Sequence, residues 1–182
     1  MKGALALSTR SMTLTAMLTA LLCIVGPLTL PIGPVPLSLT TAVLFLAALL
    51  TGPRRAMLCC GVYLLIGGIG LPVFSGFRGG ISVLMGPTGG FLLGYLPMTA
   101  LGGLFCRGTS TRLRQAGGFL AGSALLYLTG TLWYAWQTGT SAGAAMAVCV
   151  LPFLPGDAVK LAGVLLCGNA IKSRLEKAGL LK

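Results

Sequence analysis

Long apolar stretches separated by short polar breaks dominate the chain. A helix needs roughly 20 residues, within a range of about 17–25, to cross the hydrocarbon of a bilayer. Three apolar runs reach this length, at about 12–30, 89–106 and 116–136. Three others are shorter, at about 37–51, 56–71 and 157–171. Short helices can stop at a cavity instead of crossing completely, so the pattern predicts a pocket on one side.

A seventh apolar run, at 142–154, is too short to cross a bilayer alone. Pro152 and Pro155 end it, because proline lacks a backbone donor and disfavours helix before itself. We interpret this run as a re-entrant or capping segment before the last helix. The pattern therefore predicts an all-α membrane protein, a bundle of six transmembrane helices with ordered extracellular capping loops. Its length favours a single domain over residues 1–182.

Composition supports the membrane assignment. Hydrophobic residues make up 55% of the 182 residues and charged residues only 8%, with a mean hydropathy of +0.95. Soluble domains carry about 25% charged residues. The net charge of +11 lies in short polar breaks and not on a basic, aromatic-rich surface, which argues against a nucleic-acid partner.

The basic residues predict the orientation of the chain, because lysine and arginine accumulate in cytoplasmic loops. Alternate breaks hold eleven of them: Lys2, Arg10, Arg54, Arg55, Arg107, Arg112, Arg114, Lys172, Arg174, Lys177 and Lys182. The intervening breaks hold only Arg78, with Lys160 just beyond. This alternation predicts six crossings of the cell membrane with both termini in the cytoplasm. The first 27 residues resemble a secretory signal, but they lack a convincing cleavage site, which favours an uncleaved first helix.

One acid–base pair lies within the last apolar run. Asp157 is one of only two acidic residues, and Lys160 follows three positions later on the same helix face. Charge inside a membrane span is costly and usually marks a functional site. The two groups could simply neutralise each other, but their position favours a ligand of mixed polarity, with N–H groups for the carboxylate and a carbonyl or carboxylate oxygen for the ammonium group. Without histidine or clustered acids, we expect no metal, no cofactor and no catalytic residue.

The glycine-rich stretch 70–95 predicts a structured outer loop beside the pocket. It offers aromatic faces at Phe74 and Phe77, hydroxyl donors at Ser75 and Thr88, a close backbone approach at Gly89 and a cation at Arg78. Arg78 could instead contact only lipid headgroups. No GKS or GKT sequence follows the glycines, which argues against a nucleotide site.

Three weaker features complete the pattern. The proline-rich stretch 28–41 predicts a stiff turn at the rim of the pocket. Ala16 and Ala20 form a small-residue pair that lets another helix approach closely. An aromatic group near the outer end of the fifth helix is interpreted as an interfacial belt in preference to a stacking site: Tyr127, Trp133, Tyr134 and Trp136.

Several motifs together resemble a known family. "GPVPLSLTTAVLFLAALLTGPRRA", "GLPVFSGFRGG", "GPTGGFLLGY" and "PFLPGDAVK" are similar to the biotin-specific substrate-binding component (S component, BioY family) of energy-coupling factor (ECF) transporters. The resemblance implies a six-helix bundle with an outward-facing pocket for biotin. It also implies partners, namely a transmembrane coupling subunit and two ATP-binding cassette ATPases.

The resemblance also implies roles for individual residues. Asp157 and Lys160 would hold the polar head of the ligand, the glycine-rich loop would act as a lid, and Ala16 and Ala20 would dock on the coupling subunit. The sequence departs from the family at Thr40, where glutamine is common, and at Arg78, where a small or polar residue is common. Rival hypotheses are another vitamin as ligand, such as thiamine or lipoate, a membrane scaffold without transport, and a membrane enzyme using serine–lysine or cysteine–lysine chemistry.

Overall fold

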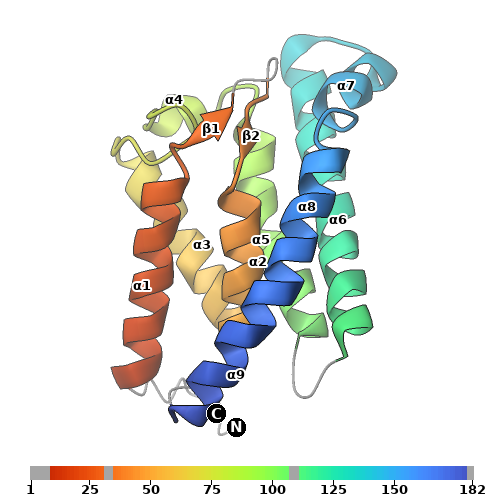
Figure 1. The fold of residues 1–182 in the computed structure, drawn as a ribbon. Coiled ribbons are helices and arrows are strands. Elements are labelled where there is room, and N and C mark those ends of the chain that lie inside the picture. The colour runs from red at the N-terminus through yellow and green to blue at the C-terminus, as the bar shows by residue number, and fades with distance from the viewer. Residues whose placement is uncertain (1–8, 31–34, 107–110, 180–182) are drawn as a thin grey trace, which may run out of the picture.

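The computed structural model describes residues 9–30, 35–106 and 111–179. Over these residues the chain is mostly helical, and the long helices run roughly side by side (Figure 1). In chain order the elements are α1 (Thr9–Val25), β1 (Thr29–Leu30), β2 (Leu37–Ser38), α2 (Thr40–Thr51), α3 (Pro53–Gly68), α4 (Ile81–Leu84), α5 (Gly89–Phe105), α6 (Arg112–Thr138), α7 (Ala142–Cys149), α8 (Leu154–Gly163), the π-helical turn η1 (Val164–Gly168) and α9 (Asn169–Lys177).

The first two helices are shorter than their apolar runs. α1 ends at Val25 and not near residue 30, because Gly26 and Pro27 follow it. The next described residues form an antiparallel strand pair, in which β1 is hydrogen-bonded to β2. α2 consequently begins at Thr40 and not at 37. The proline-rich stretch is therefore a short β-hairpin at its described positions, and residues 31–34 lie outside the described part.

The last helix is longer than its apolar run predicts. α8, η1 and α9 form one continuous helix from Leu154 to Lys177, 24 residues long. Within the described residues it is the one helix that is both long and apolar enough to cross a membrane, while α1, α2 and α5 are shorter apolar helices. It starts three residues before the predicted position because proline is tolerated in the first turn of a helix, where Pro155 lies.

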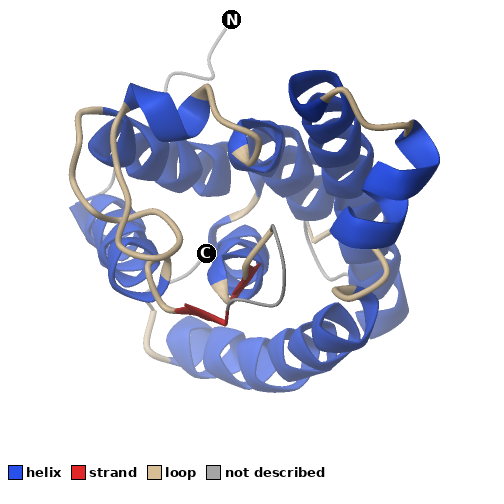
Figure 2. Ribbon diagram, turned by 90° about the horizontal axis from the view of Figure 1, so that it is seen from above, coloured by secondary structure: helices blue, strands red, loops and turns tan. Residues whose placement is uncertain are grey.

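The core of the bundle surrounds α2. Figure 2 shows this helix, entered from the strand pair, near the middle of the ring formed by the other helices. Most of its side chains are buried, including Leu44, Phe45 and Leu49. Phe45 stacks on Phe119 of α6 with ring centroids 4.5 Å apart. An apolar helix of this kind is stable only where it is covered on most sides.

α5 and α6 pack closely because glycines lie between them. A Cβ on Gly130 would come within 2.4 Å of the Phe91 ring, and one on Gly90 would come within 2.2 Å of Trp133. Small residues allow such close contact between membrane helices. The indole Nε1 of Trp133 also donates a hydrogen bond to the Gly86 carbonyl oxygen at 3.0 Å. The two helices therefore form a tightly joined pair.

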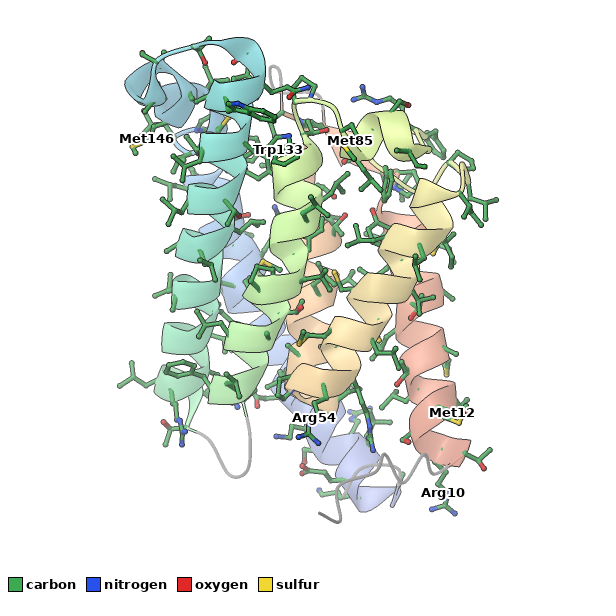
Figure 3. All side chains as sticks on the ribbon, turned by 180° about the vertical axis from the view of Figure 1, so that it is seen from behind. Arg10, Met12, Arg54, Met85, Trp133 and Met146 are labelled. Atoms are coloured by element: carbon green, nitrogen blue, oxygen red, sulfur yellow. The ribbon has the colours of Figure 1, made fainter. Side chains whose placement is uncertain are left out.

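The two ends of the bundle differ in charge. Figure 3 shows Arg10 and Arg54 at one end and Met85, Trp133 and Met146 at the other. The end that holds Arg10 also holds α9, because the Arg10 guanidinium donates to the Gly179 carbonyl oxygen at 3.1 Å. Lys2, Arg107 and Lys182, which also entered the prediction of orientation, lie outside the described residues.

Candidate functional site

The start of α8 presents the acid–base pair. Asp157 lies in the first helical turn, and its backbone N–H donates to the Phe153 carbonyl oxygen at 2.8 Å. One turn later, the Nζ of Lys160 lies 2.8 Å from Oδ1 of Asp157. The side chain of Lys160 is 8% exposed and that of Asp157 is 21% exposed. The two charges are therefore largely withdrawn from solvent while part of the carboxylate stays accessible.

Tyr127 of α6 completes this pair. Its hydroxyl donates a hydrogen bond to Oδ2 of Asp157, across a separation of 30 residues in sequence. The interfacial-belt interpretation is therefore wrong for Tyr127. It suits Trp136 better, because that side chain is 75% exposed. Each carboxylate oxygen of Asp157 thus has one protein donor, and a carboxylate offers about four acceptor positions in all. About two remain for a ligand.

Asp157 and Lys160 line an open pocket between the hairpin, the glycine-rich loop, the starts of α5 and α8 and the second half of α6. The empty space within it, solvent at its open mouth included, is about 650 Å³. The lining residues are Val35, Pro36, Ser38, Thr41, Phe74, Ser75, Arg78, Val83, Thr88, Phe91, Leu92, Tyr95, Leu126, Tyr127, Cys149, Phe153, Asp157 and Lys160.

Phe74 forms a fixed part of the apolar wall. Its ring lies directly over Gly67 of α3, where a Cβ would come within 2.1 Å of the ring. It also meets Tyr63 edge to face, with ring centroids 5.5 Å apart. The Tyr63 hydroxyl donates to the Val73 carbonyl oxygen at 3.1 Å. These contacts hold the base of the glycine-rich loop against α3.

Arg78 lies where the same loop turns back on itself. Phe74 and Arg78 form an isolated antiparallel bridge, and the turn between them places Gly76 and Phe77 at positive φ. Positive φ is costly for phenylalanine but not for glycine. The exposed Arg78 side chain donates from Nε to the Ser75 carbonyl oxygen at 3.3 Å. Its guanidinium therefore reaches the rim of the pocket and not its floor.

The structure brings six of the seven predicted ligand-binding residues to one pocket. Phe74, Ser75, Arg78, Thr88, Asp157 and Lys160 all line it. The seventh, Gly89, is buried at the start of α5 outside the lining, where a Cβ would come within 1.9 Å of the Leu84 carbonyl oxygen.

Thr40, a position at which the sequence departs from the resembled family, does not line the pocket. It is buried, and its hydroxyl forms a hydrogen bond with the hydroxyl of Ser38, which does line it. The hairpin therefore presents Ser38 to the pocket and keeps Thr40 behind it.

Sequence reasoning missed several lining residues that come from distant segments. Tyr95 and Phe91 lie on consecutive turns of α5, and the four-residue spacing that places both on one face is visible in the sequence. Phe153 and Cys149 reach the pocket from the segment before α8. Thr41 also lines it, and in the described structure its buried hydroxyl has no hydrogen-bond partner.

The chemistry of the lining favours binding over catalysis. Cys149 and Lys160 both line the pocket, as cysteine–lysine chemistry would require. However, burial raises the pKa of the Cys149 thiol to about 11. A nucleophilic cysteine needs a lowered pKa, because the thiolate is the reactive form. In the described ranges no group of three metal-ligating side chains occurs. The pocket instead combines apolar walls with a carboxylate, an ammonium group and a guanidinium at its rim.

The predicted partner-binding pair lies away from the pocket. Ala16 and Ala20 are both exposed on α1, one helical turn apart. The opposite face of α1 packs into the bundle through Ser11, Thr15 and Thr19. The alanines are therefore free to contact lipid or another helix.

Comparisons with known proteins find one matching family and several similar proteins. The family model described as BioY family matches residues 1–177. The chain is 34% identical over 163 residues to a protein of Pyrococcus horikoshii named "Probable biotin transporter BioY", covering 90% of this chain and 96% of that protein. It is 36% identical over 165 residues to "Biotin transporter BioY2" of Lactococcus lactis, covering 88% and 89%.

A solved structure has the same fold. The crystal structure of the S-component for biotin from an ECF-type ABC transporter superposes with a TM-score of 0.84 at 27% identity. The match covers 91% of this chain and 92% of that one.

Proposed function

Because the chain belongs to the BioY family, we propose that it binds biotin with high affinity and takes it up across the cytoplasmic membrane as the substrate-capture subunit of an ECF-type transporter. The observation that carries this proposal is the largely buried Asp157–Lys160–Tyr127 group in the wall of an open pocket. A charged group at this depth is stable when partners replace its lost water.

The polar head of biotin suits this group. Its ureido ring has two N–H donors and a carbonyl acceptor, and the carboxylate of Asp157 has acceptor positions left for the donors. The ammonium group of Lys160 can donate to the carbonyl. Hydrogen bonds to charged groups are shorter and stronger than those between neutral groups. The aromatic walls at Phe74, Phe91 and Phe153 then cover the thioether ring and the aliphatic chain.

The carboxylate tail of biotin would lie at the rim. Arg78 is the charged residue of the glycine-rich loop. Its exposed guanidinium can form paired hydrogen bonds with a carboxylate. Ser75 and Thr88 line the pocket and can add hydroxyl donors. Gly89 would act indirectly, through the close packing that fixes Thr88 beside it.

We propose that the chain is a single domain over residues 1–182 whose long helices, with α8, η1 and α9 as the last, make six crossings. The hairpin, the glycine-rich loop and α7 then cap the outer end. The placement of Arg10 and Arg54 at the opposite end supports cytoplasmic termini (Figure 3).

The sequence has no Walker A motif, and we propose that the energy for uptake comes from other subunits. We propose a transmembrane coupling subunit and two ATP-binding cassette ATPases as partners. The exposed Ala16 and Ala20 face on α1 suits docking on the coupling subunit, because small residues let two helices approach closely.

Binding of tritiated biotin to the purified chain tests the proposal. We expect saturable binding that unlabelled biotin displaces and that thiamine and lipoate do not. The double variant Asp157→Ala/Lys160→Ala should lose this binding. Displacement by thiamine or lipoate would indicate another vitamin, and full uptake by the double variant would indicate a scaffold.

A further inference from the structure

The last helix is wound more loosely in its middle than a regular α-helix. Val164–Gly168 forms a π-helical turn between α8 and α9. Such turns are rare and occur frequently at functional sites. This one separates the half that carries Asp157 and Lys160 from the half that continues to Lys177.

The π turn changes which side chains face the bundle. Asp157 and Asn169 are twelve positions apart (169 − 157 = 12). Twelve α-helical steps of about 100° would place them about 120° apart around the axis. A π turn takes up one extra residue, and the remaining eleven steps bring them to within about 20°. Buried or partly buried positions accordingly recur every four residues, at Lys160, Val164, Gly168 and Lys172.

Asn169 donates to the backbone of the turn from both its main chain and its side chain. Its backbone N–H donates to the Leu166 carbonyl oxygen, and not to that of Leu165 four residues before it. The side-chain Nδ2 of Asn169 donates to the Leu165 oxygen instead, at 2.8 Å. This side chain therefore bonds directly to the backbone of the π turn and supports its winding.

The same side chain fixes the turn to α6. Nδ2 of Asn169 donates to Oε1 of Gln115 at 2.8 Å, and Nε2 of Gln115 donates to Oδ1 of Asn169 at 3.3 Å. Gln115 is only 2% exposed. On the side of α2, a Cβ on Gly168 would lie 2.7 Å from the Leu49 side chain, so the two helices are in close contact there. The helix is therefore held firmly at the turn.

α8 itself is held less firmly. None of its residues, all of which the structure describes, is fully buried. Its contacts with the bundle come from partly buried positions, among them Asp157, Lys160 and Leu161, and the winding at the turn below helps to set the rotation that brings these positions inward.

We propose that Asn169 and Gln115 are positioning residues for the ligand site. By holding the π turn they set the rotation of α8, and this rotation directs Asp157 and Lys160 into the pocket. The identity of the ligand as biotin rests on the proposed function. The rotation of α8 does not depend on it and can be measured without ligand.

The test replaces both amides together, with Gln115→Leu/Asn169→Leu. This leaves no unpaired amide, and replacing both partners by apolar groups of similar shape is often nearly neutral for stability. We expect the turn to relax to α-helix, α8 to rotate, and biotin affinity to fall about tenfold or more.

Deletion of Cys167 from the double variant should restore binding. Cys167 is exposed and lies within the π turn. Its removal takes out the extra residue, so that an ordinary α-helix again aligns the two halves. We expect recovery to within roughly threefold of the wild-type affinity. Deletion of the exposed Ala170, below the turn, is the matched control and should restore nothing.

A spin-label distance tests the rotation without ligand. The labels are placed at the exposed positions Val159 and Leu65, on α8 and α3, in a background that carries Cys23→Ser and Cys167→Ser. The distance should shift by several ångströms in the double variant and return when residue 167 is deleted. An unchanged distance in the double variant, or a lost affinity that the deletion does not recover, would overturn the proposal. Wild-type protein that binds no biotin would overturn the proposed function, while the distance would still decide the positioning role.

Discussion

Asp157→Asn is the most direct probe of the site, because it removes one charge with almost no change in shape. In the wild-type protein Asp157 accepts from Lys160 at 2.8 Å and from the hydroxyl of Tyr127. The asparagine oxygen can keep Lys160, and the Tyr127 hydroxyl can rotate to accept from the new amide. The charge-assisted hydrogen bonds to ligand N–H groups, however, are lost, and one acceptor oxygen becomes a donor.

The expected loss follows from the burial of the pair. Hydrogen bonds to charged groups contribute about 1.5–3 kcal/mol each. The Lys160 side chain is only 8% exposed, so loss of its counter-charge adds to the cost. We expect about 2–4 kcal/mol of lost binding free energy, or roughly 30- to 700-fold weaker affinity.

Equilibrium binding of tritiated biotin to purified protein measures this loss. Glu176→Gln is the matched control, because Glu176 is the other acidic residue and is exposed on α9, away from the pocket. It should leave the affinity unchanged. An Asp157→Asn variant within about twofold of wild type would refute the assignment of Asp157 to the ligand head.

Three further predictions concern the apolar wall of the pocket, the cation at its rim and the exposed alanine face of α1. Gly67→Val should displace Phe74 and lower stability by about 1–3 kcal/mol, measured by thermal unfolding, with weaker biotin binding as a second effect. Arg78→Gln should weaken biotin but not biotin amide, so that the ratio of their affinities, measured by competition, falls toward one. Ala16→Leu/Ala20→Leu should leave biotin binding intact and block uptake in cells that contain the coupling subunit, because larger side chains keep the helices apart.

Two matched variants separate these effects from general damage. Gly61→Val is on the same helix as Gly67, but a Cβ there has nothing within 4 Å, so its stability should stay near that of wild type. Ala124→Leu enlarges an exposed alanine on α6 and should leave uptake unchanged. Equal losses of affinity for biotin and biotin amide in Arg78→Gln would rule out a contact between Arg78 and the carboxylate tail. Loss of biotin binding in Ala16→Leu/Ala20→Leu would contradict the docking role of these two alanines.

Sequence periodicity located the helices better than it located their ends. The apolar runs are long and unambiguous, but a helix stops where the backbone cannot continue. Gly26 and Pro27 stop α1 early, and Pro155 permits α8 to start early. The π turn was not predictable, because its extra residue is absorbed within an apolar stretch that reads as uninterrupted helix.

The candidate site was predictable where it is local in sequence. Asp157 and Lys160 are three residues apart, and helical geometry alone places them together. Tyr127 is 30 residues from Asp157, and only the packing of α6 against α8 brings it there. Aromatic residues near a membrane surface commonly act as interfacial anchors. The sequence therefore favoured that role for Tyr127 over a contact with Asp157.

α5 and α6 form one rigid wall of the pocket, because glycines let the two helices pack closely. The Trp133 side chain packs directly against Gly90, so α5 and α6 cannot move closer and have little freedom to slide past each other. We therefore expect a change of shape that accompanies loading or release to involve the hairpin, the glycine-rich loop and α8 more than the contact between α5 and α6. The distance between two probes on α5 and α6 should stay constant. It would serve as an internal reference when the movement of these other segments is measured.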